Sequence, residues 1–491
     1  MGVHVVIIRN LIAQADSNMN RPFRIISLLL AQILAMALQP LQAQKQPPNI
    51  ILIYFDDLGF GDLSRTGAIG YTTPQMDKLA SEGMFFSQFY SPQAVCSASR
   101  AGLMTGCYPN RIGFSGAMDH TSKAGLNPNE VTIAEMLKPK GYTSAAVGKW
   151  HLGHLPQFLP TNQGFDEFYG IPYSHDMWPN HPTTKNYYPA LPLIEGTKTI
   201  DTSINMSQLT TMFTERAVSF IQKNRKKPFF LYLAHPLPHV PLFVSEKFKG
   251  KSEQGAYGDV MMELDWSIGQ IRKTLADLKL DKNTIIILTS DNGPWYNYGN
   301  HAGSNGGFRE GKGGTWEGGQ RVPCIISWKG TVPEGVVSNK IASAIDILPT
   351  IADITGSSLP DHKIDGVSLG AVIKGDQLAD PRKTFYYYYR KNSLEAVRSG
   401  NWKLVLPHPG RTYEGYPPGK DGQPGKADEN HPIEGGLFDL RRDPGERHNV
   451  YKEYPEIVAQ LTKLAEEARE DLGDDLTNKL GKGRRPLELA N

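Results

Sequence analysis

Short apolar runs alternate with longer amphipathic stretches along most of the chain. Five runs are mostly apolar without alternation, as expected of strands buried on both faces: residues 49–55, 143–147, 228–234, 284–289 and 322–328. Apolar residues at helical spacing mark three longer stretches: residues 76–82, 206–224 and 257–278. This order predicts an α/β fold with a large, mainly parallel sheet flanked by helices.

The pattern changes towards the carboxyl end. Residues 407–436 are rich in Gly, Pro and charge, and are expected to form a long loop. Residues 455–472 carry apolar side chains along one helical face. We therefore predict a smaller α+β subdomain with one helix and antiparallel strands. Its strand-like runs, with a hairpin turn at Gly400 and Asn401, are residues 385–390, 395–398 and 402–406.

The amino-terminal residues have the pattern of a targeting segment. Arg21 and Arg24 precede an apolar stretch over residues 25–38, and a cleavage site is expected near Ala43. The apolar stretch is shorter than a membrane span requires. We therefore predict a signal peptide over residues 1–43, with Met19 as an alternative start, and a secreted or periplasmic protein without a membrane span.

These patterns divide the remaining chain into a main domain over residues 47–365, a C-terminal subdomain over residues 366–472 and a tail over residues 473–491. A chain of 491 residues with 40% hydrophobic residues can bury a large core. The leader contains three of the 52 basic and one of the 50 acidic residues, so the rest carries no net charge. We expect no nucleic-acid partner, because such partners are attracted by a basic field.

Paired polar residues follow two of the apolar runs. Asp56 and Asp57 end the first run, and Asp291 and Asn292 lie just beyond the fourth. Ligands of open α/β sheets gather beyond the carboxyl ends of the strands, so the two pairs are expected to converge. Adjacent carboxylates favour a bound cation, and four hard oxygen donors suit Ca²⁺ or Mg²⁺. For either pair alone, a turn or helix-capping role is the alternative.

The eleven residues from Cys96 to Gly106 read CSASRAGLMTG. This segment resembles the signature of the formylglycine-dependent (type I) sulfatases, arylsulfatase A-like members of the alkaline phosphatase superfamily. The resemblance implies that a maturase oxidises Cys96 to formylglycine (3-oxoalanine), whose hydrate is the nucleophile. It also implies Ca²⁺ as the metal, with the modified Cys96 as a further ligand. Most family members have proline in place of Ala98, which leaves the identity of the maturase open. The simpler alternative is a buried thiol before a helix.

The same resemblance assigns the catalytic groups. Arg100 belongs to the signature, and it would orient the nucleophile. Lys149, in GKWHLG, and Lys312, in GKGGTWEGG, would neutralise the sulfate oxygens. His239, in PHVP, or Lys312 would protonate the departing alcohol, and His151 would help to eliminate sulfate. In this scheme Asp291 also acts as the base that assists attack on sulfur.

Two further residues are predicted to bind substrate. Ser174 lies in GIPYSHD, which resembles a segment of the arylsulfatase site. His301 lies in a polar, glycine-rich loop between the Asp291 pair and Lys312. Aromatic residues in the neighbouring loops are placed either to stack on a sugar ring or to pack within the loops: Trp178, Trp295, Tyr296 and Tyr298.

We therefore predict an exported sulfatase that acts on a sulfated carbohydrate or an aryl sulfate. Two alternatives remain open. One is a phosphate or phosphonate ester hydrolase with the same nucleophile, and the other is a binding protein in which Cys96 is not modified. Cys107 and Cys324 are able to pair in an exported protein, but two buried thiols are favoured because Cys324 lies in an apolar run.

Overall fold

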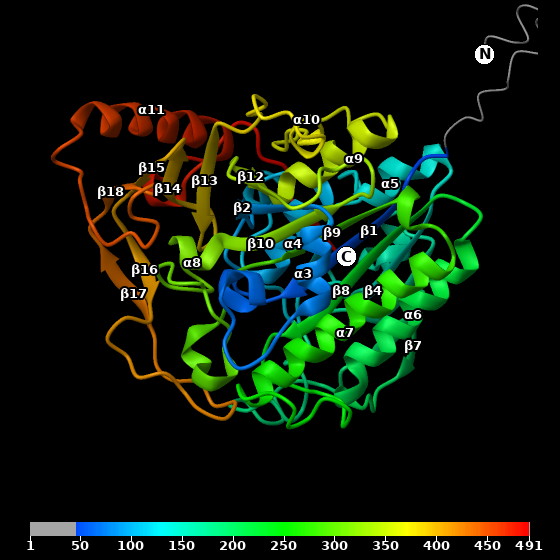
Figure 1. Cartoon of the computed structure of the whole chain (residues 1–491). Helices are drawn as coiled ribbons and strands as arrows, with labels where there is room; N and C mark the ends of the chain where they lie inside the picture. The colour runs from blue at the N-terminus through cyan, green and yellow to red at the C-terminus, as the bar shows by residue number, and fades with distance from the viewer. Residues whose placement is uncertain (1–45, 491) are drawn as a thin grey trace, which may run out of the picture. The chain divides into compact units, whose positions relative to one another are not determined.

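A large sheet forms the centre of the computed structural model, which describes residues 46–490 (Figure 1). Its eleven strands have the order β11-β2-β10-β9-β1-β8-β4-β5-β6-β7, with β12 beside β2. The central strands are mutually parallel: β9 (Thr284–Ser290), β1 (Asn49–Asp56), β8 (Phe229–Pro238), β4 (Thr143–Lys149) and β5 (Glu167–Ile171). The other strands are β2 (Met84–Tyr90), β6 (Leu193–Glu195), β7 (Lys198–Asp201), β10 (Arg321–Ser327), β11 (Val336–Ser338) and β12 (Ala342–Ser343).

Each of the five predicted apolar runs forms a strand of this sheet, which confirms the mainly parallel α/β fold. The run over residues 322–328 forms β10, which is antiparallel to both of its neighbours, β9 and β2. The direction of this strand is set by its connection and pairing, whereas an apolar run indicates burial alone. The sequence therefore predicted correctly which runs form the central sheet. It did not predict the direction of β10, and antiparallel pairs lie towards the edges of the sheet.

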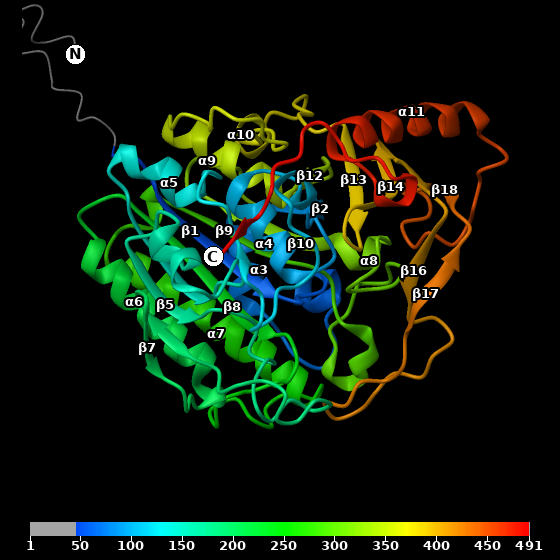
Figure 2. The same cartoon turned by 180° about the vertical axis from the view of Figure 1, so that it is seen from behind.

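Helices cover both faces of the sheet (Figures 1 and 2). On one face, α4 (Cys96–Thr105), α5 (Ile133–Leu137), α9 (Ile347–Thr355) and α10 (Gly370–Ile373) share a core with Ile50, Leu52 and Tyr54 of β1. On the other face, the predicted helices α3 (Pro74–Ser81), α6 (Leu209–Asn224) and α7 (Ala256–Asp277) share a core with Ile51, Ile53 and Phe55. Successive side chains of a strand point to opposite faces, so a strand covered on both sides is apolar at every position.

A second, four-stranded antiparallel sheet forms the C-terminal part of the chain. Its strands are β13 (Thr384–Tyr389), β14 (Ser393–Ser399), β15 (Trp402–Val405) and β18 (Gly436–Asp439). The helix α11 (Pro455–Leu472) lies on this sheet and buries Leu461, Ala465, Ala468 and Leu472 (Figure 1). The bounds of this helix are those that the apolar spacing predicted. Between the two sheets lies the short helix α8 (Glu317–Gln320).

Residues 407–436 are not the continuous loop that their composition predicted. They contain an antiparallel hairpin of β16 (His408–Thr412) and β17 (Asp428–Ile433). The prediction was wrong because β17 is polar and largely exposed, and β16 contains Pro409 and Gly410, so neither strand shows alternating apolar residues. The hairpin depends on backbone pairing and on contacts with the rest of the protein.

The carboxyl-terminal residues return to the main sheet domain. There β19 (Glu488–Leu489) pairs with β3 (Ala124–Gly125), and Arg485 forms an ion pair with Glu130. The domain boundaries drawn from the sequence stay predictions. The predicted signal peptide lies outside the described residues. Within residues 46–490, no helix combines the length and the apolar character needed to cross a membrane.

The three cysteines of the described chain, Cys96, Cys107 and Cys324, are all buried and unpaired with one another. This is the favoured alternative of the sequence analysis. Cys324 lies in β10, and Cys107 lies just beyond α4. Neither is at the carboxyl ends of the central strands.

Candidate active site

Four polar residues meet at the carboxyl ends of β1 and β9. Phe55 pairs with Ser290 in the parallel register, so the residues that follow each of them emerge side by side. Asp57 has a left-handed backbone, with φ of 65°, and its N–H donates to Asp291 Oδ1 at 3.1 Å. The Asn292 amide donates to Asp57 Oδ1 at 2.6 Å. The structure thus brings together the two polar pairs that the sequence placed at strand ends.

Cys96 is the first residue of α4 and is turned towards these carboxylates. Its Sγ lies within 4.8 Å of a carboxylate oxygen of Asp56 and of Asp291. The thiol is buried, and burial, the largest influence, raises its pKa. An unmodified Cys96 is therefore a neutral thiol and a weak nucleophile.

Three buried cations balance the carboxylates. Arg100, one turn along α4 from Cys96, donates to Asp291 Oδ2 at 2.8 Å and to the Lys149 carbonyl at 3.2 Å. Lys149, the last residue of β4, forms an ion pair with Asp56 Oδ2. Lys312 donates to Asp57 Oδ1 at 2.7 Å. Each carboxylate of the cluster therefore has its own cationic partner.

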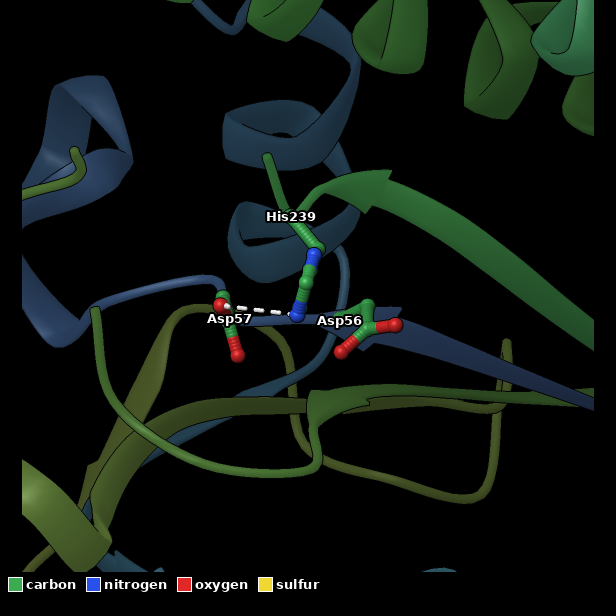
Figure 3. Close-up of side chains that lie close together, drawn as sticks. All are labelled: Asp56, Asp57 and His239. Atoms are coloured by element: carbon green, nitrogen blue, oxygen red, sulfur yellow. Dashed lines mark ion pairs between the residues drawn. The ribbon is translucent and has the colours of Figure 1, made fainter. Parts of the chain in front are cut away.

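Two histidines flank the cluster. His239 follows β8, and its Nε2 lies 3.7 Å from Asp57 Oδ2 (Figure 3). His151 contacts the Met118 carbonyl through Nε2 at 2.7 Å. Burial and the nearby Lys149 charge hold the pKa of His151 well below its usual range. A neutral His151 therefore donates from Nε2, which leaves Nδ1 as a free base, and no described residue bonds to this atom.

The electrostatics of the cluster fit a bound cation. Burial favours a higher pKa for Asp56, but the charges of Lys149 and His239 hold it well below its usual range. Burial and the charge of Asp56 raise the pKa of Asp291. Three buried oxygens have no hydrogen-bond partner in the described chain: Asp56 Oδ1, Asp57 Oδ2 and Asn292 Oδ1. Unpartnered hard oxygens that converge on one point are the donor set of a Ca²⁺ or Mg²⁺ site.

The two predicted substrate-binding residues differ in their positions. Ser174 is buried beyond the end of β5, and the next residue, His175, has its ring 5.6 Å from that of His239. The structure thus places Ser174 beside the cluster. His301 ends the 3₁₀ helix Tyr296–His301 and faces Gly422 of the loop between β16 and β17. No contact between His301 and the acidic cluster is seen among the described side chains.

Two neighbours of the cluster were not among the predicted catalytic or metal-binding residues, although Trp295 was named as a loop aromatic placed to stack on a sugar ring or to pack within its loop. Trp295 has its ring 5.4 Å from that of His239, and Lys312 Nζ lies 4.6 Å from the Trp295 ring centroid. Asp176 lies near enough to His239 and His175 for their charges to overcome the effect of burial and lower its pKa to about 2. Its Oδ1 is buried without a partner among residues 46–490. The sequence offered one signal for Asp176, its place in the GIPYSHD segment that contains Ser174.

Comparisons with known proteins agree with this geometry. The chain matches the Sulfatase family over residues 48–357, the C-terminal region of aryl-sulfatase over residues 380–487, and the C-terminal region of N-sulphoglucosamine sulphohydrolase over residues 311–405. It is 37% identical over 463 residues to N-acetylgalactosamine-6-sulfatase of Mus musculus, with 87% of each chain covered. It is 37% identical over 459 residues to arylsulfatase A of Bos taurus, with 88% of this chain and 89% of that one covered.

A solved structure shows the same likeness in three dimensions. The PsFucS1 sulfatase from Pseudoalteromonas sp. superposes with a TM-score of 0.77 at 28% identity, covering 89% of this chain and 93% of that chain. The family match spans most of the main domain, and the curated relatives extend it through the C-terminal sheet. With the buried cluster at the strand ends, these likenesses show that the chain is an enzyme of the sulfatase family.

Proposed function

We propose that this sulfatase is an exported hydrolase of sulfate monoesters that uses formylglycine at position 96 and a bound Ca²⁺. The observation that carries the proposal is the position of Cys96. Its Sγ lies within 4.8 Å of carboxylate oxygens on both central strands, in a buried cluster that holds three cations. A nucleophile at this point is surrounded by the charges that an anionic ester and its transition state require.

The metal would be held by Asp56, Asp57, Asp291 and Asn292. Oxygen donors of this kind favour Ca²⁺ over zinc, and three of their oxygens have no partner in the described protein. When bound, Ca²⁺ would supply positive charge that draws the sulfate ester to the cluster. The four residues would also keep their fixed positions at the ends of β1 and β9, which are held by the parallel pairing of the two strands.

Cys96 is the residue that we propose a maturase converts. Formylglycine at this position supplies a hydrated aldehyde, in which one hydroxyl is the nucleophile and the other allows sulfate to leave. Conversion also explains why a neutral, buried thiol occupies the centre of the site, since the thiol itself is a weak nucleophile. Ala98, which replaces the family's usual proline, lies in the same turn of α4 and leaves the choice of maturase open.

The remaining residues orient charge and move protons. Arg100 fixes Asp291 through its guanidinium and keeps it aimed at position 96. Lys149 and Lys312 present ammonium groups to the sulfate oxygens. His239, buried beside Asp57 and Trp295, donates a proton to the departing alcohol oxygen.

His151 has the opposite role. Its Nε2 proton is bound by the Met118 carbonyl, so Nδ1 is free to accept a proton from the group at position 96. Its lowered pKa keeps it in the neutral form that such a base requires. The two histidines therefore divide the acid and base steps between them.

We propose a sulfated carbohydrate as the substrate. The supporting observations are the names of the relatives, which include an N-acetylgalactosamine-6-sulfatase, and the partly exposed ring of Trp295 beside His239, which packs on the buried Tyr298. Aromatic rings stack well on the apolar faces of sugar rings. The leader predicted over residues 1–43 supports export to the periplasm or the exterior, where such glycans are met.

The proposal is tested by two measurements on protein from its native host. The first is the mass of the peptide that contains residue 96, where formylglycine replaces the mass of the thiol by that of an aldehyde or its hydrate. The second is sulfate release from an aryl sulfate, with the matching aryl phosphate as the comparison. Modified peptide and preferential sulfate release support the proposal. An unmodified thiol together with an inactive protein contradicts it, and preference for the phosphate ester identifies a phosphatase instead. Cys96→Ser, purified with its serine unconverted, is expected to stop turnover and retain a stable sulfate ester.

A further inference from the structure

Lys312 lies in a glycine-rich segment whose backbone is flexible by itself. Gly311, Gly313 and Gly314 surround it, and Gly313 has φ of 83°. Glycine gives the backbone wide conformational freedom, so such a segment needs external contacts to hold a side chain at one point. The Lys312 ammonium nevertheless lies 2.7 Å from Asp57 Oδ1, inside the buried cluster. The position of the Lys312 side chain is therefore fixed by contacts that the backbone of this segment makes with other parts of the protein.

Two of these contacts come from the main sheet domain. The Lys312 N–H donates to the Pro294 carbonyl at 2.9 Å, just beyond Asp291 and Asn292. The Gly313 N–H donates to the Ala94 carbonyl at 2.9 Å, two residues before Cys96. The segment is thereby joined to both the metal-binding strand end and the helix that starts at the nucleophile.

The third set of contacts comes from the C-terminal hairpin. Arg411 and Tyr413, in and just beyond β16, both donate to the Lys312 carbonyl oxygen, at 3.1 Å from Arg411 Nη1 and 2.5 Å from the Tyr413 hydroxyl. The guanidinium also packs on the next residue, since a Cβ added to Gly313 would lie 2.3 Å from Arg411 Nη1. The hairpin thus caps the peptide that carries Lys312 and leaves no room for a side chain beside it.

The hairpin is itself fixed on both sides of this contact. Arg411 Nε donates to Glu429 of β17 at 2.9 Å, which ties the two strands together. The Tyr413 N–H donates to the Glu310 carboxylate at 2.9 Å, and the Thr412 hydroxyl donates to the same carboxylate. The residues on either side of Gly311 are therefore held by one short strand, whose sequence gave no sign of a strand at all.

We infer that Arg411 and Tyr413 are positioning residues, which act through the Lys312 main chain to hold the Lys312 ammonium at the sulfate-binding point. The C-terminal hairpin is then part of the catalytic apparatus, although it contributes no group to the reacting atoms. This inference rests on the proposed role of Lys312 in binding sulfate oxygens.

The test is a double-mutant cycle with the full-length enzyme. Arg411→Gln and Tyr413→Phe, separately and together, are measured in the wild-type and the Lys312→Ala backgrounds. Loss of one hydrogen bond at the carbonyl is expected to lower kcat by about fivefold, and loss of both by about 10²-fold, as for a misplaced catalytic group. In the Lys312→Ala background the same substitutions are expected to change kcat by less than about twofold.

A matched control separates positioning from general disruption of the hairpin. Arg390 pairs with Glu429 and donates to Asn430 of the same hairpin, so Arg390→Gln removes a comparable arginine contact. We expect Arg390→Gln to leave kcat within about twofold of wild type. Affinity for inorganic sulfate, measured by calorimetry, gives a second readout of the cycle should turnover of Lys312→Ala fall below detection. Melting temperatures show that each variant is folded.

The outcomes distinguish the inference from the function on which it rests. Absence of sulfate release by modified wild-type enzyme contradicts the proposed function itself. If the wild type is active, equal losses from Arg411→Gln and Tyr413→Phe with and without Lys312 overturn the positioning role, because the two residues then act independently of it. An equal loss from Arg390→Gln overturns it as well. The positioning role is supported if the effects of Arg411→Gln and Tyr413→Phe on kcat largely disappear in the Lys312→Ala background and Arg390→Gln leaves kcat unchanged.

Discussion

Two of the buried clusters of charged side chains within residues 46–490 differ in how completely they are paired. The active-site cluster, Asp56, Asp57, Asp291, Arg100, Lys149 and Lys312, joins the carboxyl ends of the central strands. The bridging cluster, Glu317, Lys403 and Glu446 with the surrounding Arg398, Tyr90 and Tyr387, joins α8 to the C-terminal sheet. Both are removed from solvent, yet they have different uses.

In the bridging cluster the protein itself supplies the partners. Lys403 Nζ contacts the Thr315 carbonyl at 2.8 Å, Glu317 at 3.3 Å and Glu446 at 2.7 Å. Both oxygens of Glu317 accept from tyrosine hydroxyls, at 2.7 and 2.6 Å. In the active-site cluster, Asp56 Oδ1, Asp57 Oδ2 and Asn292 Oδ1 all lack a hydrogen-bond partner among the described residues. In the bridging cluster, Glu446 Oε1 also lacks one, but it lies 2.7 Å from the Lys403 ammonium. A closed network stabilises one arrangement, whereas an open one has capacity left for a ligand.

The largest effect that we predict is on activity, and it follows from a substitution in the active-site cluster. Asp291→Asn keeps the side-chain shape but removes the carboxylate charge beside position 96. We expect kcat/KM to fall by at least about 10³-fold, as when a preorganised electrostatic group is lost. Because Asp291→Asn also leaves the fully buried Arg100 without its closest carboxylate partner, we expect the melting temperature of the metal-free enzyme to fall as well. Sulfate release and thermal unfolding of the variant check both parts. A fully active variant would contradict the role of Asp291.

In the bridging cluster we expect a substitution to lower mainly the stability of the protein. Lys403→Met removes the positive charge between Glu317 and Glu446, which are both fully buried. Leaving two buried carboxylates without this partner should cost about 3–5 kcal/mol of unfolding free energy. The measurement is urea unfolding, with Lys391→Met as an exposed control. If Lys403→Met lost activity while keeping wild-type stability, the distinction between the two clusters would be wrong.

Removal of the metal should also separate the clusters. A calcium chelator is expected to abolish sulfate release, and added Ca²⁺ should restore it. At a ligand concentration of 100 times Kd, a bound ion adds about 2.7 kcal/mol to stability, which the chelator would remove. Calorimetric melting with and without chelator measures this change. Asp56→Ala should lose the calcium response, whereas Lys403→Met should retain it on its lower baseline. A chelator without effect on wild-type activity argues against the proposed ion.

The sequence predicted the main features of the fold because its helices and central strands are apolar in regular patterns. Burial of apolar side chains stabilises the strand over residues 49–55 and the helix over residues 455–472. The spacing of apolar residues in the sequence reflects this burial. The direction of β10 and the hairpin of β16 and β17 depend on tertiary pairing, which leaves no such periodic signal. The pattern therefore fails where the backbone is held by its neighbours.

The predicted site shows the same division. Strand ends and family motifs placed Asp56, Cys96 and Lys312 together, because parallel strands deliver their carboxyl ends to one edge. Residues that act through contacts with distant segments were missed. Tyr413, a hundred residues beyond Lys312, contacts its carbonyl, and nothing in the local sequence marks that relation. Asp176 was quoted within a motif, but its approach to His239 is a property of the folded loop.

A substitution of Asp176, which lies at the edge of the active-site cluster, is predicted to have an effect of intermediate size on activity. Its pKa of about 2 keeps it ionised near neutral pH, and its Oδ1, which has no hydrogen-bond partner within residues 46–490, is suited to accept a hydrogen bond from a substrate hydroxyl. We expect Asp176→Asn to lower kcat/KM for a sugar sulfate by about tenfold and to leave a small aryl sulfate, which has no such hydroxyl, nearly unchanged. Parallel kinetics with the two substrates provide the check. Equal losses on both would assign Asp176 to the sulfate itself.

The smallest predicted effect concerns an ion-pair network that is only partly buried, between Arg111 and α11. Arg111 is fully buried and pairs with Asp365 at 2.7 Å and with Asp471 at 2.6 Å, while the Asp471 side chain is 31% exposed. The hydrogen bond from Arg111 is the largest influence that lowers the pKa of Asp471, to about 2 from an ordinary value of 3.8. The stabilisation is therefore complete above about pH 4 and is lost as the pH falls towards 2.

Asp471→Asn should accordingly lower the unfolding free energy by about 1 kcal/mol at pH 7, since solvent weakens a partly exposed pair. The difference from wild type should shrink as the pH falls from 4 towards 2, because the wild-type carboxylate then takes up a proton too. Urea unfolding of both proteins across this range measures it. A difference that persists unchanged at the acid end would mean that Asp471 stabilises the contact through hydrogen bonds that an amide cannot replace, and not through its charge.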